Sequence, residues 1–361
     1  ANKCKLKNFI KKNYKKIVTE LDVFNLNFPS NMKITITGTN GKSTTAKLIH
    51  DIFKKYKHDV RLVGNIGNPV LSEKNIRKST IFVIEASSYQ LDYSQYFNSN
   101  YSLILNISHD HLERHGNFNK YAKAKFKLIK NQSKDDVALL DSHLLLKKMT
   151  QKYKVKSKVK FISVENYTEI KKYIYNPYFL TSGNLKNSIF VFELIKHFKF
   201  TQKKFYEVVN NFKPLKYRQQ IVYNKNNLTV INDSKSTSFS STLPLLDTKK
   251  KLYWLLGGLP KKGDQLKIKS NSKKNIIAYI YGNNKNFFIN SIKNKITYHI
   301  CKNIFICLKK IFSEVKKEPS VKKTILFSPS AASFDEFKNF EKRGEYFNKI
   351  IHRFIKNEKI F

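Results

Sequence analysis

The chain has 361 residues, 41% of them hydrophobic, which is enough to form packed cores in two domains. Its formal net charge of +43 comes from 69 basic against 26 acidic residues, and because the lysines are scattered through every segment we attribute this charge to compositional drift rather than to a nucleic-acid surface. No apolar run approaches the roughly 20 residues of a membrane-spanning helix, and the first residues lack the apolar stretch of a secretory signal, so we expect a cytoplasmic protein.

The first 31 residues form a lead-in rich in Lys and Asn, in which a short strand is predicted at Val18–Phe24. Strand-like and helix-like segments then alternate, which favours an α/β fold with a mostly parallel sheet. A helix is predicted at Thr44–Lys55 because its apolar residues recur on one helical face. Strands are predicted at Met32–Thr37, Ile81–Ile84 and Leu103–Ile107.

Each of these strands runs into polar residues at its carboxyl end. The first is followed by a glycine loop, the second by Glu85 and its neighbours, and the third by Ser108–His115, which holds three histidines. In open α/β sheets, ligands bind beyond the carboxyl ends of the strands. We therefore expect the three polar clusters to share one edge of the sheet.

The glycine loop, Gly38-Thr-Asn-Gly-Lys-Ser-Thr-Thr45, is typical of a phosphate site, although it has two fewer residues before Gly-Lys than the usual P-loop. Its glycines let backbone N–H groups approach phosphate oxygens, and the helix that follows adds its positive N-terminal end. Lys42 can reach terminal phosphates, and Ser43 or Thr44 can hold Mg²⁺. A glycine turn with an incidental lysine would explain neither the strand before it nor the helix after it.

Glu85 and His111 end neighbouring strands and are able to share a divalent cation near the phosphates. The alternative is that His109, His111 and His115 are solvated loop histidines, and the residues alone leave the two interpretations equally open. A zinc site is disfavoured because no cysteine lies nearby. The three cysteines, Cys4, Cys301 and Cys307, are an odd number without metal-type spacing, as expected in a reducing compartment.

A helix near Tyr121 presents one misplaced lysine. Lys125 falls in the middle of the apolar side of this helix, whereas the other lysines project to the opposite side: Lys120, Lys123, Lys127 and Lys130. A buried lone ammonium is costly, so Lys125 should be paired or chemically altered. The alternative, a lysine that snorkels to the helix edge, is the one that helical spacing alone favours.

After Phe212–Arg218 the alternation restarts, which predicts a second, Rossmann-like domain that ends in a long helix after Phe334. Its strands are predicted at Leu228–Ile231, Leu252–Leu256, Ile276–Tyr281, Ile296–Ile300 and Thr324–Phe327.

Three loops of this second domain have polar residues suited to ligands. Asp233 follows a strand and is able to orient a ribose or a helix N-terminus, and Lys235 is able to meet a phosphate. Leu255–Asp264 is another strand-to-loop site, and Leu326–Asp335 is predicted to open the terminal helix, whose N–H groups suit a carboxylate. Taken singly, turn and cap interpretations explain these segments equally well.

Taken together, these motifs occur in an order that resembles the Mur ligases, from about Thr19 to the C-terminus. The loop and the histidine region are shared by a superfamily that includes folylpolyglutamate synthases, whereas two segments of the second domain resemble the D-glutamate-adding branch. The motifs are GTNGKSTT, GNIGNP, EASSYQL, NISHDHLERHG, YAKAK, NDSKST, LGGLPKKGD and FSPSAASFDEFKNFEKRG.

The resemblance implies a central P-loop-type ATPase domain with a mostly parallel sheet, followed by the Rossmann-like domain. It implies ATP and Mg²⁺ as cofactors and an acyl-phosphate intermediate, through which D-glutamate is added to UDP-N-acetylmuramoyl-L-alanine for peptidoglycan synthesis, and hence for cell shape and division. The implied domain limits are residues 1–31 for a remnant of an N-terminal domain and its linker, 32–213 for the ATP-binding domain and 214–361 for the C-terminal domain.

The same resemblance assigns roles to residues. Lys42 and the loop would hold the β- and γ-phosphates, Lys125 would be carbamylated beside a metal, and Asp110 would support the loop. The ATP contacts implied are Gly38, Thr39, Asn40, Gly41, Lys42, Ser43, Thr44, Asn184, Asn187, Arg218 and Asp233. The metal set implied is Ser43, Thr44, Glu85, His111 and Lys125, with Lys42, Lys125, His111 and Glu85 as the catalytic residues. The nucleotide-sugar peptide would contact Asn65, Ser87, Ser88 and Gln90, and D-glutamate with the acyl phosphate would contact Lys235, Thr237, Lys262 (or its neighbour Lys261), Ser333, Phe334 and Phe340.

Two features depart from the family pattern. Only about 37 residues precede Gly38, so we expect most of the family's uridine-nucleotide-binding domain to be missing from this chain. The usual His-Asn pair on the adenine side is Gly183-Asn184 here. We expect small-molecule substrates, no membrane or nucleic-acid partner and a monomer; the alternatives are another superfamily ligase, such as a folylpolyglutamate synthase, and a basic nucleic-acid-binding protein with an ATPase-like core.

Overall fold

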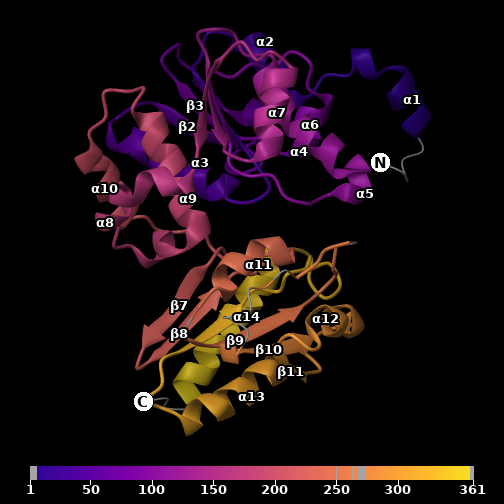
Figure 1. The fold of residues 1–361 in the computed structure, drawn as a ribbon, viewed down its shortest axis with the longest axis vertical. Helices are drawn as coiled ribbons and strands as arrows, with labels where there is room; N and C mark the ends of the chain where they lie inside the picture. The colour runs from indigo at the N-terminus through magenta and orange to yellow at the C-terminus, as the bar shows by residue number, and fades with distance from the viewer. Residues whose placement is uncertain (1–5, 249, 262, 267, 269–273, 358–361) are drawn as a thin grey trace. The chain divides into compact units, whose positions relative to one another are not determined.

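The computed structural model describes residues 6–248, 250–261, 263–266, 268 and 274–357, and the chain divides into two compact units, residues 1–212 and 213–361 (Figure 1). Each unit contains one six-stranded sheet. The strand orders of the two sheets confirm the predicted class, a P-loop-type domain followed by a Rossmann-like domain.

The first sheet is parallel throughout and has the strand order β2-β3-β1-β4-β5-β6. β1, β3 and β5 are buried along their whole length, which explains why these segments are continuous apolar or Thr-containing runs. The predicted strands are confirmed, except that the third begins two residues earlier and ends at Ile104. The bounds are β1 Lys33–Thr37, β2 Val60–Gly64, β3 Ile81–Glu85, β4 Tyr101–Ile104, β5 Val137–Asp141 and β6 Lys158–Ile162.

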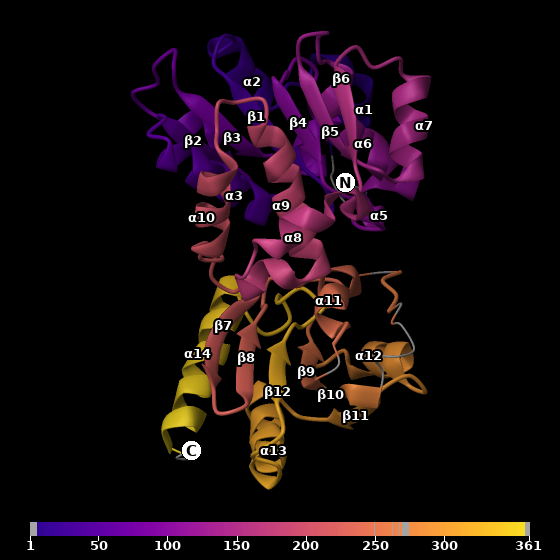
Figure 2. The ribbon, with the colours of Figure 1, turned by 60° about the vertical axis from the view of Figure 1, so that its left-hand side comes forward.

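Helices cover both faces of this sheet. One core joins β1, β3 and β4 to α3, α9 and α10, and two further clusters on the opposite face join the sheet to α2, α4, α6 and α7. Figure 2 shows α9 and α10 in front of the strands. The bounds are α1 Lys7–Lys12, α2 Glu20–Asn27, α3 Lys42–Lys55, α4 Ser88–Tyr93, α5 Leu112–His115, α6 Phe118–Lys130, α7 Leu144–Lys152, α8 Thr168–Lys172, α9 Ser182–Ile195 and α10 Gln202–Asn210, with 3₁₀ turns η1 Tyr14–Lys16, η2 Val70–Ser72, η3 Val164–Tyr167 and η4 Pro177–Leu180.

The strand predicted at Val18–Phe24 is wrong, because this segment enters the helix α2. Thr19 donates its backbone N–H and its hydroxyl to Asp22 Oδ2, at 2.8 and 3.1 Å, and so closes a capping box at the helix start. Leu21 and Phe24 then share the buried face of the helix. The apolar residues of this segment are therefore spaced as on one face of a helix, although some residues of the segment are β-branched and so resemble a strand.

Asp22 also ties α2 to the loop after α4. Its side chain is fully buried, and Oδ1 accepts hydrogen bonds from the backbone N–H groups of Gln95, Tyr96 and Phe97 and from the Ser94 hydroxyl, at 2.7 to 3.0 Å. Burial raises the pKa of Asp22, but the hydrogen bonds from Thr19, Ser94 and Tyr96 outweigh it, and the pKa lies below its usual value.

We predict that Asp22→Asn lowers the free energy of unfolding of the chain by roughly 2–3 kcal/mol near pH 7, because an amide NH₂ then replaces an oxygen that accepts hydrogen bonds. Because the folded-state pKa of Asp22 is depressed, its contribution is present above the unfolded pKa and is lost as the pH falls through that value and below. Denaturant titration at pH 7 and at pH 3 measures both effects. The exposed Asp135→Asn is the matched control, and equal stability of the two variants would contradict the assignment.

The second sheet has the order β11-β10-β9-β12-β8-β7, with β7 antiparallel to β8 and all other pairs parallel, as Figure 2 shows. α13 and α14 pack on one face, and α11 and α12 on the other. The bounds are β7 Gln220–Lys225, β8 Leu228–Asn232, β9 Lys251–Gly257, β10 Ile276–Tyr281, β11 Thr297–Ile300 and β12 Lys323–Phe327, with α11 Phe239–Leu246, α12 Lys285–Ile292, α13 Ile304–Lys317 and α14 Phe340–Asn357.

The terminal helix is confirmed, but Leu326–Asp335 does not open it. α14 begins at Phe340, because Asn339 Oδ1 accepts a hydrogen bond from the backbone N–H of Lys342 at 2.8 Å and caps the first turn. The residues between β12 and α14 form a loop, in which Ser330 has a positive φ of 57°. In the described part of the chain, no helix has an apolar stretch that would cross a membrane.

Candidate active site

The carboxyl ends of β1, β3 and β4 meet at one edge of the first sheet. Ile36 is paired with Glu85, and Thr37 with Ile104, so the glycine loop, Glu85 and the segment after β4 are neighbours. The shared edge is the arrangement that the sequence predicts for its three polar clusters, but β1 lies between β3 and β4, so Glu85 and His111 do not follow neighbouring strands as expected.

Gly41 fixes the turn from the loop into α3. It has a left-handed φ of 84°, which favours glycine, and a Cβ at this position would lie 2.3 Å from Asn187 Oδ1, so Asn187 would have to move to admit any side chain. Asn187 in turn donates to Asn184 Oδ1 at 3.3 Å, and both asparagines are buried on α9. The structure therefore brings Asn184 and Asn187 to the same place as the loop.

Asn106 braces the other side of the loop. Its Oδ1 accepts hydrogen bonds from the backbone N–H groups of Thr39 and Asn40, at 3.1 and 2.8 Å, and its Nδ2 donates to Asn40 O at 2.9 Å. Thr39 also contacts Tyr121, hydroxyl to hydroxyl, at 3.1 Å. Asn106 was not predicted as a site residue, because it lies inside the strand predicted at Leu103–Ile107, and its contacts with the loop form only once β1 and β4 are paired.

Two lysines donate to the same carbonyl oxygen. Lys42 Nζ lies 3.0 Å from Gly38 O and 2.9 Å from Thr39 O, and Lys125 Nζ lies 2.8 Å from Gly38 O. Lys125 also lies over the Tyr121 ring, at 4.7 Å from its centroid. Lys125 is 2% exposed, so it does not snorkel, and burial, together with the charge of Lys42, holds its pKa well below the usual value.

Glu85 is buried at the end of β3 and joins two of the predicted site residues. Ser43 donates its hydroxyl to Glu85 Oε2 at 2.5 Å, and Asn65 Nδ2 donates to Oε1 at 2.9 Å. Thr44, the other predicted hydroxyl ligand, contacts the Tyr178 hydroxyl at 2.8 Å.

The three histidines after β4 differ in environment. His111 has a left-handed φ of 52° and its Nδ1 lies 2.8 Å from the Tyr89 hydroxyl, while its Nε2 lies 3.4 Å from Asp110 Oδ2. His115 is buried and contacts the Ser88 hydroxyl at 3.0 Å, so it is not a solvated loop histidine. Within the described residues, no group of three or more His, Cys, Asp or Glu side chains is placed to hold a metal ion.

The residues predicted to contact the nucleotide-sugar peptide are engaged in internal hydrogen bonds. Ser87 caps α4 together with Gln90, and Gln90 Nε2 donates to Glu20 Oε1 at 2.6 Å. Ser88 is bonded to His115, and Asn65 to Glu85. These side chains lie around the same edge as the loop, but a ligand would have to share or replace those bonds.

In the second unit, Asp233 is buried at the start of the loop that follows β8. Its Oδ1 accepts from the backbone N–H of Gln219 at 3.1 Å and its Oδ2 from the Ser328 hydroxyl at 2.9 Å, and burial raises the pKa of Asp233 to about 7. Lys235 Nζ lies 4.1 Å from the centroid of the Phe340 ring, which brings these two predicted residues together. Of the others, Ser333 is buried, Arg218 and Thr237 are half-buried, Phe334 is 71% exposed, and Lys262 lies outside the described residues.

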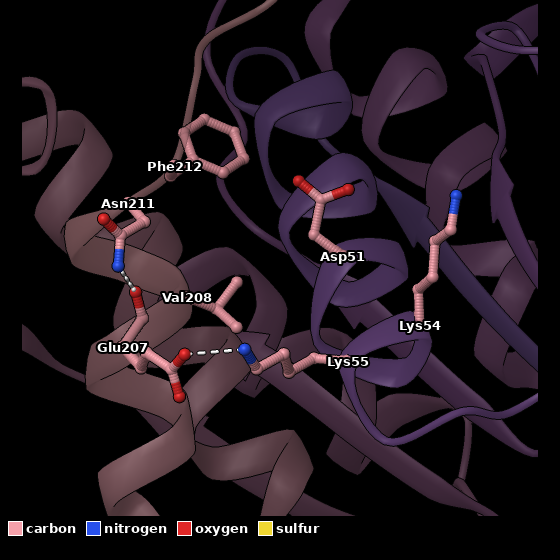
Figure 3. A pocket seen from close by; sticks show the side chains of 7 residues that line it. All are labelled: Asp51, Lys54, Lys55, Glu207, Val208, Asn211 and Phe212. Atoms are coloured by element: carbon pink, nitrogen blue, oxygen red, sulfur yellow. Dashed lines mark hydrogen bonds and ion pairs between the residues drawn. The ribbon is translucent and has the colours of Figure 1, made fainter.

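A shallow hollow of about 530 Å³ lies elsewhere on the first unit, between α3 and α10 (Figure 3). It is lined by Asp51 and Lys54 and crossed by an ion pair of 2.6 Å between Lys55 and Glu207. Because it adjoins the C-terminal half of α3, whereas the loop adjoins the N-terminal end of that helix, it is not part of the candidate site.

We predict that Gly41→Ala abolishes nucleotide binding to the chain and lowers its melting temperature, because the methyl group would displace Asn187 from the loop. Gly116→Ala is the matched control, since Gly116 has nearly the same φ, 83°, but a Cβ there would meet nothing within 4 Å. Fluorescence titration with a labelled ATP analogue measures the difference. Equal affinities of the two variants would show that the contact with Asn187 is irrelevant to the loop.

Comparisons with known proteins agree with this geometry. A family model described as the Mur ligase middle domain matches residues 36–197. A protein of Rickettsia prowazekii (strain Madrid E) named UDP-N-acetylmuramoylalanine–D-glutamate ligase is 33% identical over 356 residues, which cover 93% of this chain and 79% of that protein.

Two solved structures share the fold. The MurF ligase from Thermotoga maritima in complex with ADP has a TM-score of 0.64 at 16% identity, covering 95% of this chain and 84% of that one. FolC from E. coli in complex with DHPP and ADP has a TM-score of 0.60 at 11% identity, covering 93% of each chain. The fold alone is thus common to several ligases, but the identity over almost the whole chain is specific: this chain belongs to the Mur ligases, in the family of UDP-N-acetylmuramoylalanine–D-glutamate ligases.

Proposed function

We propose that this chain catalyses the ATP-dependent addition of D-glutamate to UDP-N-acetylmuramoyl-L-alanine, a step of peptidoglycan precursor synthesis in the cytoplasm. The observation that carries the proposal is the identity to a ligase of that name along 93% of the chain, which includes the loops of the second unit. The shared fold supports ATP as a cofactor, since a similar structure is an ADP complex.

The first unit fits a nucleotide phosphate chain. The left-handed Gly41 keeps the entrance of α3 free of a Cβ, and Asn106 holds the backbone of Thr39 and Asn40 in place. The loop N–H groups, the N-terminal end of α3 and the Lys42 ammonium then offer positive charge to phosphate oxygens. Asn184 and Asn187, Arg218 and Asp233 are the further nucleotide contacts that we propose.

Hydroxyl and carboxylate oxygens suit Mg²⁺. Ser43 Oγ and Glu85 Oε2 lie 2.5 Å apart, and these two residues would hold the ion, with Thr44 and His111. When bound, ATP with Mg²⁺ supplies the phosphoryl group that activates the substrate carboxylate as an acyl phosphate. The protein positions the reactants and neutralises charge. The amine of D-glutamate attacks the acyl carbon, and phosphate leaves as the amide forms.

Lys125 is the residue that we propose to be carbamylated. Its depressed pKa leaves a larger share of the amine neutral, and a neutral amine is the form that adds to CO₂. The addition forms an N–C bond and releases one amine proton to solvent, so the product is an anion, which would relieve the repulsion between Lys125 and Lys42 at Gly38 O and would lie in the region that we assign to the metal.

In the second unit, we propose that Lys235, Thr237, Ser333 and Phe340 contact D-glutamate and the acyl phosphate, together with Phe334 and Lys262. The contact between Lys235 and Phe340 supports a common location for these two residues. We propose small-molecule substrates and a monomer. The folylpolyglutamate alternative shares the fold, but the sequence identity favours the D-glutamate ligases.

A coupled assay of ADP release tests the proposal. We predict release only when UDP-N-acetylmuramoyl-L-alanine and D-glutamate are both present, with at least ~100-fold lower rates for L-glutamate, a discrimination of about 3 kcal/mol. Turnover with a folate acceptor and L-glutamate would identify the alternative ligase. Tight DNA binding with a steep salt dependence, in the absence of turnover, would favour the nucleic-acid alternative.

We predict that Lys125→Ala lowers the rate of amide formation at least ~100-fold and that short carboxylates partly restore it, because they replace the anionic group. Lys123→Ala, an exposed lysine on the same helix, is the control and should retain activity within about twofold. Mass spectrometry detects the carbamate on Lys125 in the unaltered chain, and steady-state rates measure amide formation by each variant. Full activity of Lys125→Ala would rule out a role for a carbamate on Lys125.

A further inference from the structure

Arg343 lies on α14 and is almost completely buried, with 1% of its surface exposed. Its guanidinium donates from Nε to the Ser234 hydroxyl at 3.1 Å and from Nη2 to Ser234 O at 2.7 Å and Ala331 O at 2.9 Å. The third nitrogen, Nη1, makes no hydrogen bond of normal geometry in the described part of the chain, although the Tyr281 hydroxyl interacts with the guanidinium. A charged group at this depth is costly unless its surroundings compensate it, so its position needs an explanation.

The surroundings of this guanidinium belong to the loops of three adjacent strands. Ser234 follows β8 and Ala331 follows β12, while a Cβ on Gly258, which follows β9, would lie 3.0 Å from Nη1. These strands are neighbours in the order β9-β12-β8. One side chain from the terminal helix therefore fixes the carboxyl edge of the second sheet.

The chemistry of the site requires an arginine rather than any cation. Its rigid plane donates from two separate nitrogens, Nε and Nη2, whereas the three N–H donors of a lysine ammonium all radiate from a single nitrogen. Burial lowers the pKa of Arg343 from its usual value, while Tyr281 and Asp335 oppose this shift and so compensate part of the charge.

The loops held by Arg343 carry the residues that we propose to bind the amino acid. Ser234 lies directly before Lys235, and Ala331 lies two residues before Ser333. The Ser234 hydroxyl also donates to Phe340 O at 2.8 Å, and the Phe340 ring contacts Lys235. The loops after β9 and β12 are joined by paired backbone hydrogen bonds between Leu259 and Ala332. The loop after β8 is joined to the loop after β12 at its start, where the Ser328 hydroxyl donates to Asp233 Oδ2 at 2.9 Å, and Arg343 adds the contact further along both loops.

We propose that Arg343 is a positioning residue for the amino-acid acceptor: it holds the loop after β8 against the loop after β12, so that D-glutamate binding depends on it. This inference rests on the proposed ligase function for its kinetic consequence. The structural claim, that Arg343 orders the two loops, does not depend on which reaction the chain catalyses.

The kinetic test compares Arg343→Lys with Arg353→Lys, an exposed arginine on the same helix, in the full chain. We expect Arg343→Lys to raise the KM for D-glutamate at least ~10-fold and to change the KM for ATP by less than about twofold, with Arg353→Lys unaffected. A merely structural role would change both KM values in parallel or neither, and either result would overturn the proposal.

Hydrogen–deuterium exchange separates this inference from the proposed function, because it needs no turnover. In Arg343→Lys, amides of residues 233–238 and 328–334 should exchange at least ~10-fold faster, while those of α13 stay unchanged. Unchanged exchange in both loops would overturn the proposal even if the ligase activity is confirmed. Conversely, absence of glutamate-dependent ADP release in the unaltered chain would reject the ligase and leave the exchange result to decide the role of Arg343.

If Arg343→Lys does not fold, Ser234→Ala provides the same test with a smaller change to the structure. This change removes the acceptor of Nε and the donor to Phe340 O but keeps the backbone carbonyl of residue 234. We expect about a threefold rise in the KM for D-glutamate and faster exchange confined to residues 233–238. Exchange and KM equal to those of the unaltered chain would overturn the proposal.

Discussion

Two lysine side chains, Lys42 and Lys125, donate to one carbonyl oxygen, that of Gly38, and this convergence constrains the rest of the first unit. Two ammonium groups that share an acceptor repel each other, and burial strengthens the repulsion because water no longer screens it. Negative charge relieves it, whether it comes from phosphates, from Glu85 nearby or from a modification of Lys125. A site of this kind is suited to anions and unsuited to an apolar ligand.

The surrounding residues and helices hold the loop and the two lysines in place. Asn106 and Gly41 hold the loop backbone, α6 delivers Lys125 from one face of the sheet, and α9 delivers Asn187 from the other. In the second unit, the buried guanidinium of Arg343 holds the loops that follow the parallel strands. Both units thus place irregular backbone at the carboxyl ends of strands and stabilise it with polar side chains from helices.

The features that could be predicted from the sequence are those with a local cause. The apolar run of β3 and the periodicity of α3 identify a buried strand and a helix. The position of Lys125 on the apolar side of α6 marks it as unusual, although spacing alone favours a snorkelling side chain and only the structure shows that it is buried. Asp22 illustrates the limit, because its capping contact with Thr19 makes a helix of a segment whose composition predicts a strand.

Contacts between distant segments were not predictable in this way. Asn106, Tyr89 and Arg343 reach their partners only after the sheets have formed, so no spacing in the sequence signals their roles. The start of α14 at Phe340 was missed for a related reason. Asn339 caps it, whereas the serines before it, which also resemble caps, belong to the loop that Arg343 holds.

The most direct test of the central claim is a crystal structure of the chain with Mg²⁺ and a non-hydrolysable ATP analogue. We expect the β- and γ-phosphates on the backbone N–H groups of Gly38–Ser43, with the cation bound by the Ser43 hydroxyl and the Glu85 carboxylate. Phosphates bound anywhere else, for example in the hollow lined by Lys54 and Lys55, with the loop left unchanged, would contradict it.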